Sequence, residues 1–253
     1  EFKYHHPVNF DTNAWTVFWA ALITALATGL GALPFLITSR VDRKWLAVAN
    51  AVASGLMLGA SFGLIAEAFH TSELRTLIGI IVGVAFIAFF RRILGNQKEM
   101  NVGQLRGADA TKALLIVGVM TLHSFTEGVG VGVSFGGGRE LGLLITIAIA
   151  VHNIPEGLAI SLVLVPRGAS AWRAGWWSIF SSLPQPLMAV PAYLFVLYFQ
   201  PLLPFGLGLA GGAMIWMVIS ELLPDAFEEA SSSLIATVTT LSFAAMLAFQ
   251  AWL

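Results

Sequence analysis

Two stretches in the middle of the chain, His123–Gly128 (HSFTEG) and His152–Gly157 (HNIPEG), share one pattern of residue types. In each, a histidine is followed four positions later by a glutamate and then a glycine, and each lies inside a long apolar run. Side chains four positions apart lie on one face of a helix, one turn from each other. Ionisable side chains in such apolar segments are costly, and they therefore predict a functional site.

Two imidazoles and two carboxylates on neighbouring helices are enough to hold a divalent metal ion. A single histidine in an apolar helix is explained equally well by a hydrogen bond to another helix. Two matching pairs on adjacent segments favour the metal site over polar packing. We therefore predict that His123, Glu127, His152 and Glu156 are metal ligands.

The composition indicates an integral membrane protein. Of 253 residues, 57% are hydrophobic and only 11% are charged, whereas soluble proteins have about 25% charged residues. The lipid bilayer is thus one expected partner, and the lack of a basic run argues against nucleic acid. The chain has no cysteine, which excludes disulfides, thiolate metal sites and cysteine catalysis. It begins at Glu1 rather than at a methionine, which leaves room for a presequence or domain before it.

Apolar runs of the length that crosses a bilayer, about 20 residues, recur along the chain. They predict an all-α membrane protein with eight transmembrane helices in a single transmembrane domain. The predicted spans are residues 14–37, 45–69, 74–90, 110–135, 141–165, 172–198, 205–227 and 233–253. The one long polar connection, residues 91–109, joins the third and fourth spans. Two prolines flanking Gln185 predict a break within the sixth span.

The distribution of cations predicts the orientation of these spans. If the N-terminus lies outside, ten Lys and Arg residues fall in the inner loops and three on the outer side. Since inner loops carry the excess of positive charge, both termini are predicted to lie on the extracytosolic side. The loop 91–109 then faces the cytosol or its equivalent, and the sequence does not identify the membrane.

The second and seventh predicted spans resemble each other. Residues 55–57 (GLM) and 67–69 (EAF) of the second match 212–214 (GAM) and 225–227 (DAF) of the seventh, with spacings that differ by one residue. These spans cross in opposite directions. We therefore predict a 3+2+3 arrangement, in which spans one to three and six to eight are inverted repeats around a central helix pair.

The predicted topology places both histidines near the middle of the membrane, on antiparallel spans. Glu127 then lies one turn outside His123, and Glu156 one turn inside His152. This predicts two layers, with His152 beside Glu127 on the outer side and His123 beside Glu156 on the inner side. One ion between the layers could contact all four side chains.

Other polar or soft side chains have competing interpretations. Met57 is explained by core packing, with a thioether ligand as the alternative. Asn153 and Gln185 are typical of hydrogen bonds between membrane helices, although both could offer a carbonyl oxygen to a metal. The carboxylates near the ends of the spans are expected to be solvated: Glu67, Glu221 and Asp225.

These features together resemble the ZIP (Zrt/Irt-like, solute carrier 39) family of metal transporters, over essentially the whole chain. The resemblance is carried by the eight spans, the long loop between the third and fourth, and the paired motifs. Residues 55–61 (GLMLGAS) and 220–222 (SEL) with Pro224 are similar to the family as well. The resemblance implies metal transport, with Met57 joining the primary site formed by the paired motifs.

The resemblance also implies a role for the polar residues beside the ligands. Ser124, Asn153 and Gln185 fall at positions that help form a second, adjacent metal site in family members with a binuclear centre. None of the three carries a carboxylate here, so we predict one principal site. An elevator-like movement of spans one, four, five and six against the rest is a further implication.

We therefore expect a transporter of divalent transition metals into the cytosolic side, with Zn²⁺ the first choice of substrate. Fe²⁺, Mn²⁺ and Cd²⁺ suit the same ligands, no organic cofactor is expected, and a homodimer is a candidate assembly. One alternative is an intramembrane zinc-dependent hydrolase, which needs an open coordination position and a base; the usual His-Glu-x-x-His signature is absent. The other is a non-transporting metal sensor, which would bind metal without flux.

Overall fold

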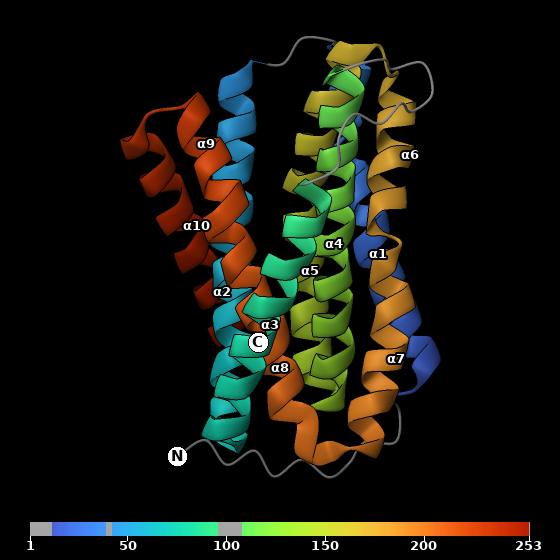
Figure 1. Cartoon of the computed structure of the whole chain (residues 1–253), viewed down its shortest axis with the longest axis vertical. Coiled ribbons are helices and arrows are strands. Elements are labelled where there is room, and N and C mark those ends of the chain that lie inside the picture. Colours follow the sequence, from blue (N-terminus) through green and yellow to red (C-terminus); the bar gives the residue numbers. More distant parts are fainter. Residues whose placement is uncertain (1–11, 39–41, 96–107, 253) are drawn as a thin grey trace.

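The computed structural model describes residues 12–38, 42–95 and 108–252, and the regular structure of these residues is helical, without strands. The longer helices lie side by side along the long axis of the molecule (Figure 1). In chain order the elements are α1 (Ala14–Leu30), η1 (Leu33–Leu36), α2 (Arg43–Thr71), α3 (Glu73–Gly95), α4 (Ala108–Gly136), α5 (Arg139–Leu164), η2 (Val165–Arg167), α6 (Ala171–Ser182), α7 (Pro184–Tyr198), η3 (Gln200–Leu202), α8 (Leu203–Met217), η4 (Val218–Leu222), α9 (Leu223–Glu229) and α10 (Ser232–Trp252).

Local sequence signals account for several helix ends. The side chain of Asn13 caps α1 by accepting a hydrogen bond from the backbone N–H of Thr16 at 2.9 Å. Gly138, with φ of 135°, forms the turn from α4 into α5, and Gly168, with φ of 94°, ends η2 before α6. Glycine suits both positions because it adopts positive φ without steric cost.

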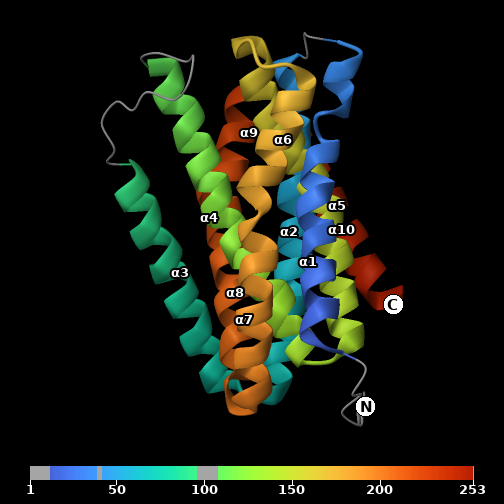
Figure 2. The same cartoon turned by 90° about the vertical axis from the view of Figure 1, so that its right-hand side faces the viewer.

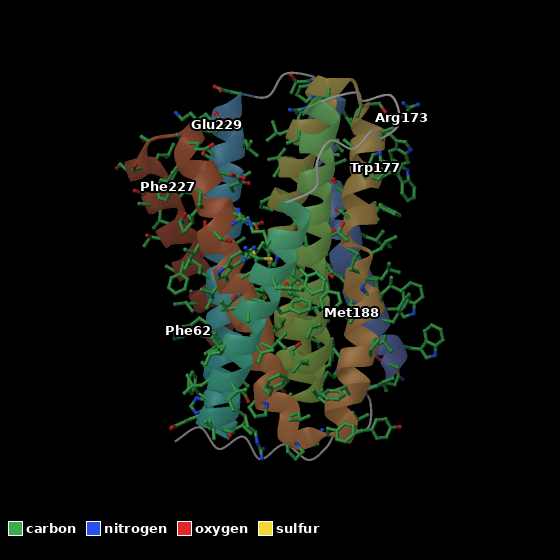
Figure 3. All side chains as sticks on the ribbon, viewed as in Figure 1. Phe62, Arg173, Trp177, Met188, Phe227 and Glu229 are labelled. Carbon is green, nitrogen blue, oxygen red and sulfur yellow. The ribbon has the colours of Figure 1, made fainter. Side chains whose placement is uncertain are left out.

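Six helical segments within the described residues are long and apolar enough to cross a membrane, and α1 is a shorter apolar helix of 17 residues. Large apolar side chains project from the outside of the bundle, among them Phe62, Trp177 and Phe227 (Figure 3). Such an extensive apolar surface fits contact with lipid. The chain is therefore an all-α membrane protein, as its composition predicts, while the full eight-span arrangement stays a prediction.

The helices form two groups that pack along a common interface. In the α4–α5 group, α4 packs on α7, and α1 packs on α5, α6 and α7. In the α2–α8 group, α2 packs on α8, α9 and α10, and α8 packs on α3. Figure 1 shows α6 and α7 at the right and α9 and α10 at the left, and Figure 2 shows α3 at the edge of the bundle. The groups meet where α2 contacts α5 and α4 contacts α8.

Three predicted spans differ in detail from the observed helices. The first is shorter, because α1 ends at Leu30 and Pro34, in the 3₁₀ helix that follows, cannot donate a hydrogen bond to the carbonyl of Leu30. The sixth predicted span consists of two helices, α6 and α7, that meet at Leu183, and this confirms the predicted break. Pro184 is the first residue of α7. The seventh contains one π-helical stretch, η4, between α8 and α9.

The predicted loop 91–109 is shorter than expected at both ends. Helix α3 continues to Gly95 and α4 begins at Ala108, while residues 96–107 lie outside the described part of the chain. The α5–α6 connection lies at one end of the bundle, called here the α5–α6 end, and the turn at Gly138 lies at the other, called the α4–α5 end (Figure 1). The inverted repeats, the orientation of the chain and the homodimer stay predictions.

Candidate metal centre

The two histidine–glutamate motifs face each other because α4 and α5 are packed neighbours joined by a short turn. Spacing by four residues puts both ionisable side chains of each helix on one face. The exposed fractions of His123, Glu127, His152 and Glu156 are 1%, 0%, 0% and 5%. Groups of this kind, buried this completely, need charge partners or a bound cation.

The shortest contact between the motifs joins the two helices, and a longer contact lies within α4. Nε2 of His152 lies 2.6 Å from Oε1 of Glu127, and Nε2 of His123 lies 3.6 Å from the same oxygen. The first contact has the pairing that the layered arrangement predicts. One ligand atom each of His123, Glu127 and Glu156 can be chosen so that all lie within 4.8 Å of one another. Both motifs therefore border one small volume.

Met57 brings a soft ligand to the same volume from the other helix group. Its Sδ lies 3.2 Å from Nε2 of His123, and the residue is fully buried on α2. A zinc ion held tetrahedrally at about 2.1 Å has neighbouring ligand atoms about 3.4 Å apart. The Met57–His123 and His123–Glu127 separations of 3.2 and 3.6 Å bracket that value. These two separations thus suit a tetrahedral cation, whereas the 2.6 Å between Nε2 of His152 and Oε1 of Glu127 is shorter than the separation of two of its ligands.

The carboxylate of Glu156 supports the same interpretation. Its two oxygens are buried and have no hydrogen-bond partner among the described residues. Buried polar atoms are normally satisfied, and a buried carboxylate is especially costly to leave alone. Nδ1 of His123 and Nδ1 of His152 are also buried without a partner in the described chain. A divalent cation would supply what the carboxylate lacks.

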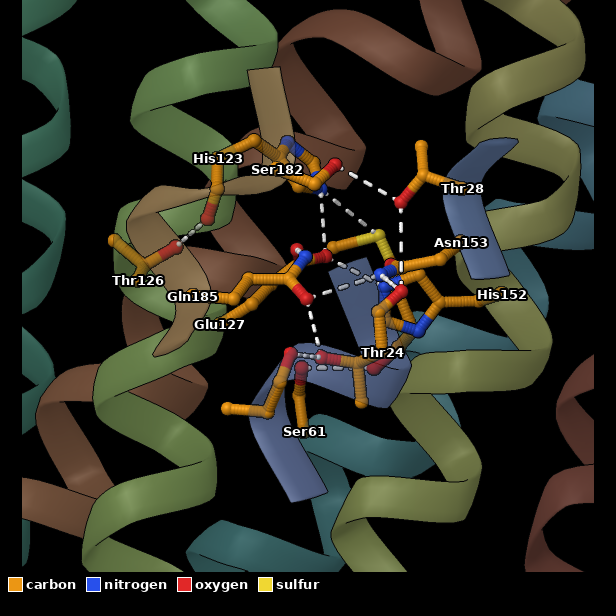
Figure 4. A network of polar contacts seen from close by, with 12 residues as sticks. Thr24, Thr28, Ser61, His123, Thr126, Glu127, His152, Asn153, Ser182 and Gln185 are labelled. Atoms are coloured by element: carbon orange, nitrogen blue, oxygen red, sulfur yellow. Dashed lines mark hydrogen bonds and ion pairs between the residues drawn. The ribbon is translucent and has the colours of Figure 1, made fainter. Parts of the chain in front are cut away.

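Two of the three residues at the predicted second-site positions, Asn153 and Gln185, belong to a hydrogen-bond network (Figure 4). Nε2 of Gln185 donates to Oε2 of Glu127 at 2.6 Å. Nδ2 of Asn153 donates to Oε1 of Gln185 at 3.2 Å and to the backbone oxygen of Thr24 at 2.8 Å. The hydroxyl of Ser124 is buried without a partner among the described residues. The amide of Gln185 therefore directs its nitrogen, not its oxygen, at the shared carboxylate.

Thr24 is the residue of this network that sequence reasoning missed. Its hydroxyl forms a short hydrogen bond to Oε1 of Gln185, and it is fully buried on α1. The only signal in the sequence was a hydroxyl inside an apolar span, which commonly marks a helix contact. Nothing in the spacing of Thr24 and Gln185 connects them.

A small pocket lies beside the centre, on the side toward the α5–α6 end. On α2 it is lined by Met57, Ala53 and Asn50, at successive turns toward the start of the helix. Their exposed fractions rise from 0% through 2% to 8% in that order. Glu156 and Ala159 line the same side of α5. The pocket therefore extends the centre toward the end that the orientation prediction assigns to the cytosol.

The acidic residues near the span ends differ from one another. Glu67 and Asp225 are exposed, as expected of solvated carboxylates. Glu221 is not solvated as expected: its side chain is 11% exposed, and its Oε1 lies 2.9 Å from Nε of Arg91. Arg91 also lies over the ring of Trp216, 5.6 Å from its centroid. This ion pair ties α3 to η4, a contact that spacing along the chain does not indicate.

The glycine that ends each motif has a packing role. A methyl group on Gly128 would lie 2.5 Å from the backbone oxygen of Gln185, and one on Gly157 would lie 1.7 Å from that of Thr28. Such distances leave no room for a Cβ atom, so each glycine lets a second helix approach the residue beside a ligand. The motif therefore specifies both the predicted ligands and the contacts that hold them.

The sequence is similar to known zinc transporters over most of its length. Residues 94–248 match the family described as "ZIP Zinc transporter". A putative zinc transporter of Arabidopsis thaliana is 53% identical over 234 residues, which cover 91% of this chain but 38% of the relative. The zinc transporter GufA of Myxococcus xanthus is 35% identical over 223 residues, 81% of this chain and 86% of the relative.

A further relative is the zinc transporter ZIP11 of Homo sapiens, which is 32% identical over 163 residues, 59% of this chain and 46% of that protein. The chain thus spans less than half the length of the Arabidopsis and human relatives and most of the length of the bacterial one. The match to the family covers both motifs and the helices that carry them. The chain belongs to the ZIP family of zinc transporters.

Proposed function

We propose that this chain transports Zn²⁺ across a membrane by binding it at His123, Glu127, His152 and Glu156, with Met57 as an additional ligand. The observation that carries the proposal is the convergence of nitrogen, oxygen and sulfur donors at the separations given above. Nitrogen and oxygen donors with a thioether suit zinc. The names of the relatives, all zinc transporters, support the same substrate.

The arrangement of the two helix groups suggests how the cation moves. The four motif ligands are carried by the α4–α5 group, whereas Met57 belongs to the α2–α8 group. A displacement of one group against the other would separate Met57 from the remaining ligands and weaken cation binding. The pocket toward the α5–α6 end then provides the route of release, into the cytosolic side if the predicted orientation holds.

Other divalent ions are compatible with the same donors. Fe²⁺, Mn²⁺ and Cd²⁺ bind nitrogen and oxygen ligands, and Cd²⁺ also favours the thioether. Selectivity among them depends on geometry and availability more than on the identity of the donors. We therefore treat them as further substrates to be tested in competition with zinc.

Transport is favoured over the two alternatives considered for this sequence. The relatives are named as transporters, which argues against an intramembrane zinc-dependent hydrolase. A sensor would bind zinc at the same donors but would carry no flux. A flux measurement therefore separates the sensor from the transporter directly, and chelator-sensitive cleavage of peptide or lipid would be needed to support the hydrolase.

The test is uptake of labelled zinc into liposomes that contain the purified full chain. Replacing any of the four motif ligands by alanine should lower the initial rate by more than about tenfold, since even residues that support metal ligands have effects of that size. Ser134→Ala is the matched control, because Ser134 is buried on α4 and donates only to the local carbonyl of Val131. Normal uptake by all four alanine variants would refute the site.

A further inference from the structure

Helix α1 contributes no metal ligand to the centre, yet one of its side chains contacts the centre through Gln185. The Thr24 hydroxyl and Nδ2 of Asn153 both reach Oε1 of Gln185, and Nε2 of Gln185 donates to Oε2 of Glu127. All four residues are fully buried. Each polar atom of the Gln185 side chain thus has a defined partner (Figure 4).

Only one orientation of the Gln185 amide satisfies its contacts with Glu127 and Asn153. The Thr24 hydroxyl, which also donates to the backbone oxygen of Ala21 at 2.7 Å, holds the amide oxygen on the α1 side. Rotating the amide by half a turn would place its oxygen against the carboxylate oxygen of Glu127 and its nitrogen against the amide nitrogen of Asn153. Both new contacts would be unfavourable, because two acceptors would face each other at one end and two donors at the other. In a buried site such unpaired groups are costly.

The backbone of Gln185 is fixed independently of this network. Its carbonyl packs so closely on α4 that a methyl group on Gly128 would lie 2.5 Å from the oxygen. Gln185 also follows the break at Leu183, in the first turn of α7. The backbone cannot shift to correct a misplaced amide, so the side-chain partners alone determine which end faces Glu127.

The orientation has a consequence for the number of cations. Oε2 of Glu127 accepts an N–H of Gln185, whereas Oε1 lies beside His152 and His123. The oxygen of Gln185, which could have served as a ligand, is turned away toward α1. We propose that Thr24 is a positioning residue, which holds the Gln185 amide so that Glu127 presents Oε1 to the histidines and to one cation. The inference rests on the proposed function.

Thr28 provides a matched comparison on the same helix. It lies one turn further along α1, is equally buried, and shares a hydrogen bond of 2.9 Å with the hydroxyl of Ser182. That bond joins α1 to α6 without contacting Gln185. A purely structural role of buried threonines on α1 would therefore make Thr24 and Thr28 equivalent, whereas a positioning role makes only Thr24 affect the centre.

The experiment uses the purified full chain with Co²⁺ as the probe, followed by titration calorimetry and by the visible absorption of the bound ion. Wild type should bind one Co²⁺. Thr24→Val should weaken binding about tenfold, the lower end of the usual effect of residues that orient metal ligands, and should change the absorption spectrum. Thr24→Ser keeps the hydroxyl and should restore both properties. Thr28→Val should leave the affinity and the spectrum unchanged.

A second arm tests whether Thr24 acts through Gln185. In a Gln185→Met background the additional change Thr24→Val should have no effect on Co²⁺ affinity, because coupled residues are not additive. Three outcomes would overturn the inference while leaving the proposed function intact. The effects of Thr24→Val and Gln185→Met on Co²⁺ affinity could be additive, Thr24→Val and Thr28→Val could have equal effects, or Thr24→Val could keep the wild-type affinity and spectrum. Failure of wild type to bind any divalent cation would instead remove the proposed function and the inference together.

Discussion

Nε2 of His152 lies 2.6 Å from Oε1 of Glu127, in the buried centre between α4 and α5. At this separation the two atoms share a hydrogen bond, and the tautomer of the imidazole decides which of them carries its proton. Metal ligands must be deprotonated, so a cation that binds the atom carrying this proton must displace it, to Nδ1 of the imidazole or to solvent.

We predict that the displaced proton leaves for solvent, so that zinc binding releases at least one proton. Adding Zn²⁺ to the purified protein in weak buffer should lower the pH, whereas Ca²⁺, which prefers sites made only of oxygen ligands, should not. Calorimetry in buffers of different ionisation enthalpy gives the number of protons released. Zinc binding without proton release at every pH from about 5 to 8, the range in which histidine titrates, would contradict the exchange.

Met57 should contribute to affinity and to the preference for soft ions. Met57→Leu keeps the volume of the core, a type of change that costs less than about 1.5 kcal/mol of stability, but removes the thioether. Because Cd²⁺ gains more than Mn²⁺ from a thioether, we expect Cd²⁺ binding to fall about tenfold and Mn²⁺ binding to change little. Met214→Leu, at a fully buried position on α8, is the control. Equal losses for both ions would assign Met57 to packing.

Gln185→Glu should add a second cation to the centre. A carboxylate in place of the amide removes the N–H that occupies Oε2 of Glu127, and the two facing carboxylates would repel each other unless a cation lay between them. The number of bound Zn²⁺ ions should rise from one to two in titration calorimetry. Gln185→Met, which removes the amide without adding charge, should still bind one. An unchanged stoichiometry in Gln185→Glu would argue against this role of the amide.

The close packing of α4 on α7 should make one glycine indispensable and a neighbour replaceable. A methyl group on Gly132 would lie 2.1 Å from the backbone oxygen of Ala189, whereas one on Gly130 would have no neighbour closer than 3.5 Å. Gly132→Ala should therefore lower the free energy of unfolding by about 1–3 kcal/mol or more, and Gly130→Ala should be neutral or stabilising because alanine favours helix. Thermal unfolding in detergent measures both. Equal melting temperatures would mean that the helices separate at no cost.

The orientation of the chain can be tested with single cysteines, because the natural sequence contains none. Arg139 at the α4–α5 end and Arg173 at the α5–α6 end are both exposed. If the excess of cations marks the inner side, Arg173→Cys should react only with reagents that enter the cytosol, and Arg139→Cys with impermeant reagents from outside. The reverse labelling pattern would invert the predicted topology and with it the direction of the pocket.

Patterns within single helices were predictable from the sequence. The apolar runs indicated a helical membrane protein, and the prolines around Gln185 indicated the break that the structure places at Leu183. The four-residue spacing of the motifs put His123 and Glu127, and likewise His152 and Glu156, on one face of each helix. All of these depend on backbone geometry that repeats along a helix, and periodicity in the sequence is enough to reveal it.

Three contacts were decided only by the tertiary structure. They are the contact of Met57 with His123, the ion pair of Arg91 with Glu221 and the hydrogen bond of Thr24 with Gln185. Each joins helices that are far apart in the chain, and each depends on how those helices are rotated and how closely they pack. The orientation of the Gln185 amide was likewise not predictable from the sequence, since either its oxygen or its nitrogen could face Glu127. Residue types and spacing thus determined which candidate ligands are present. Helix packing decided which atom each of them presents, because the partners that orient a side chain come from other helices.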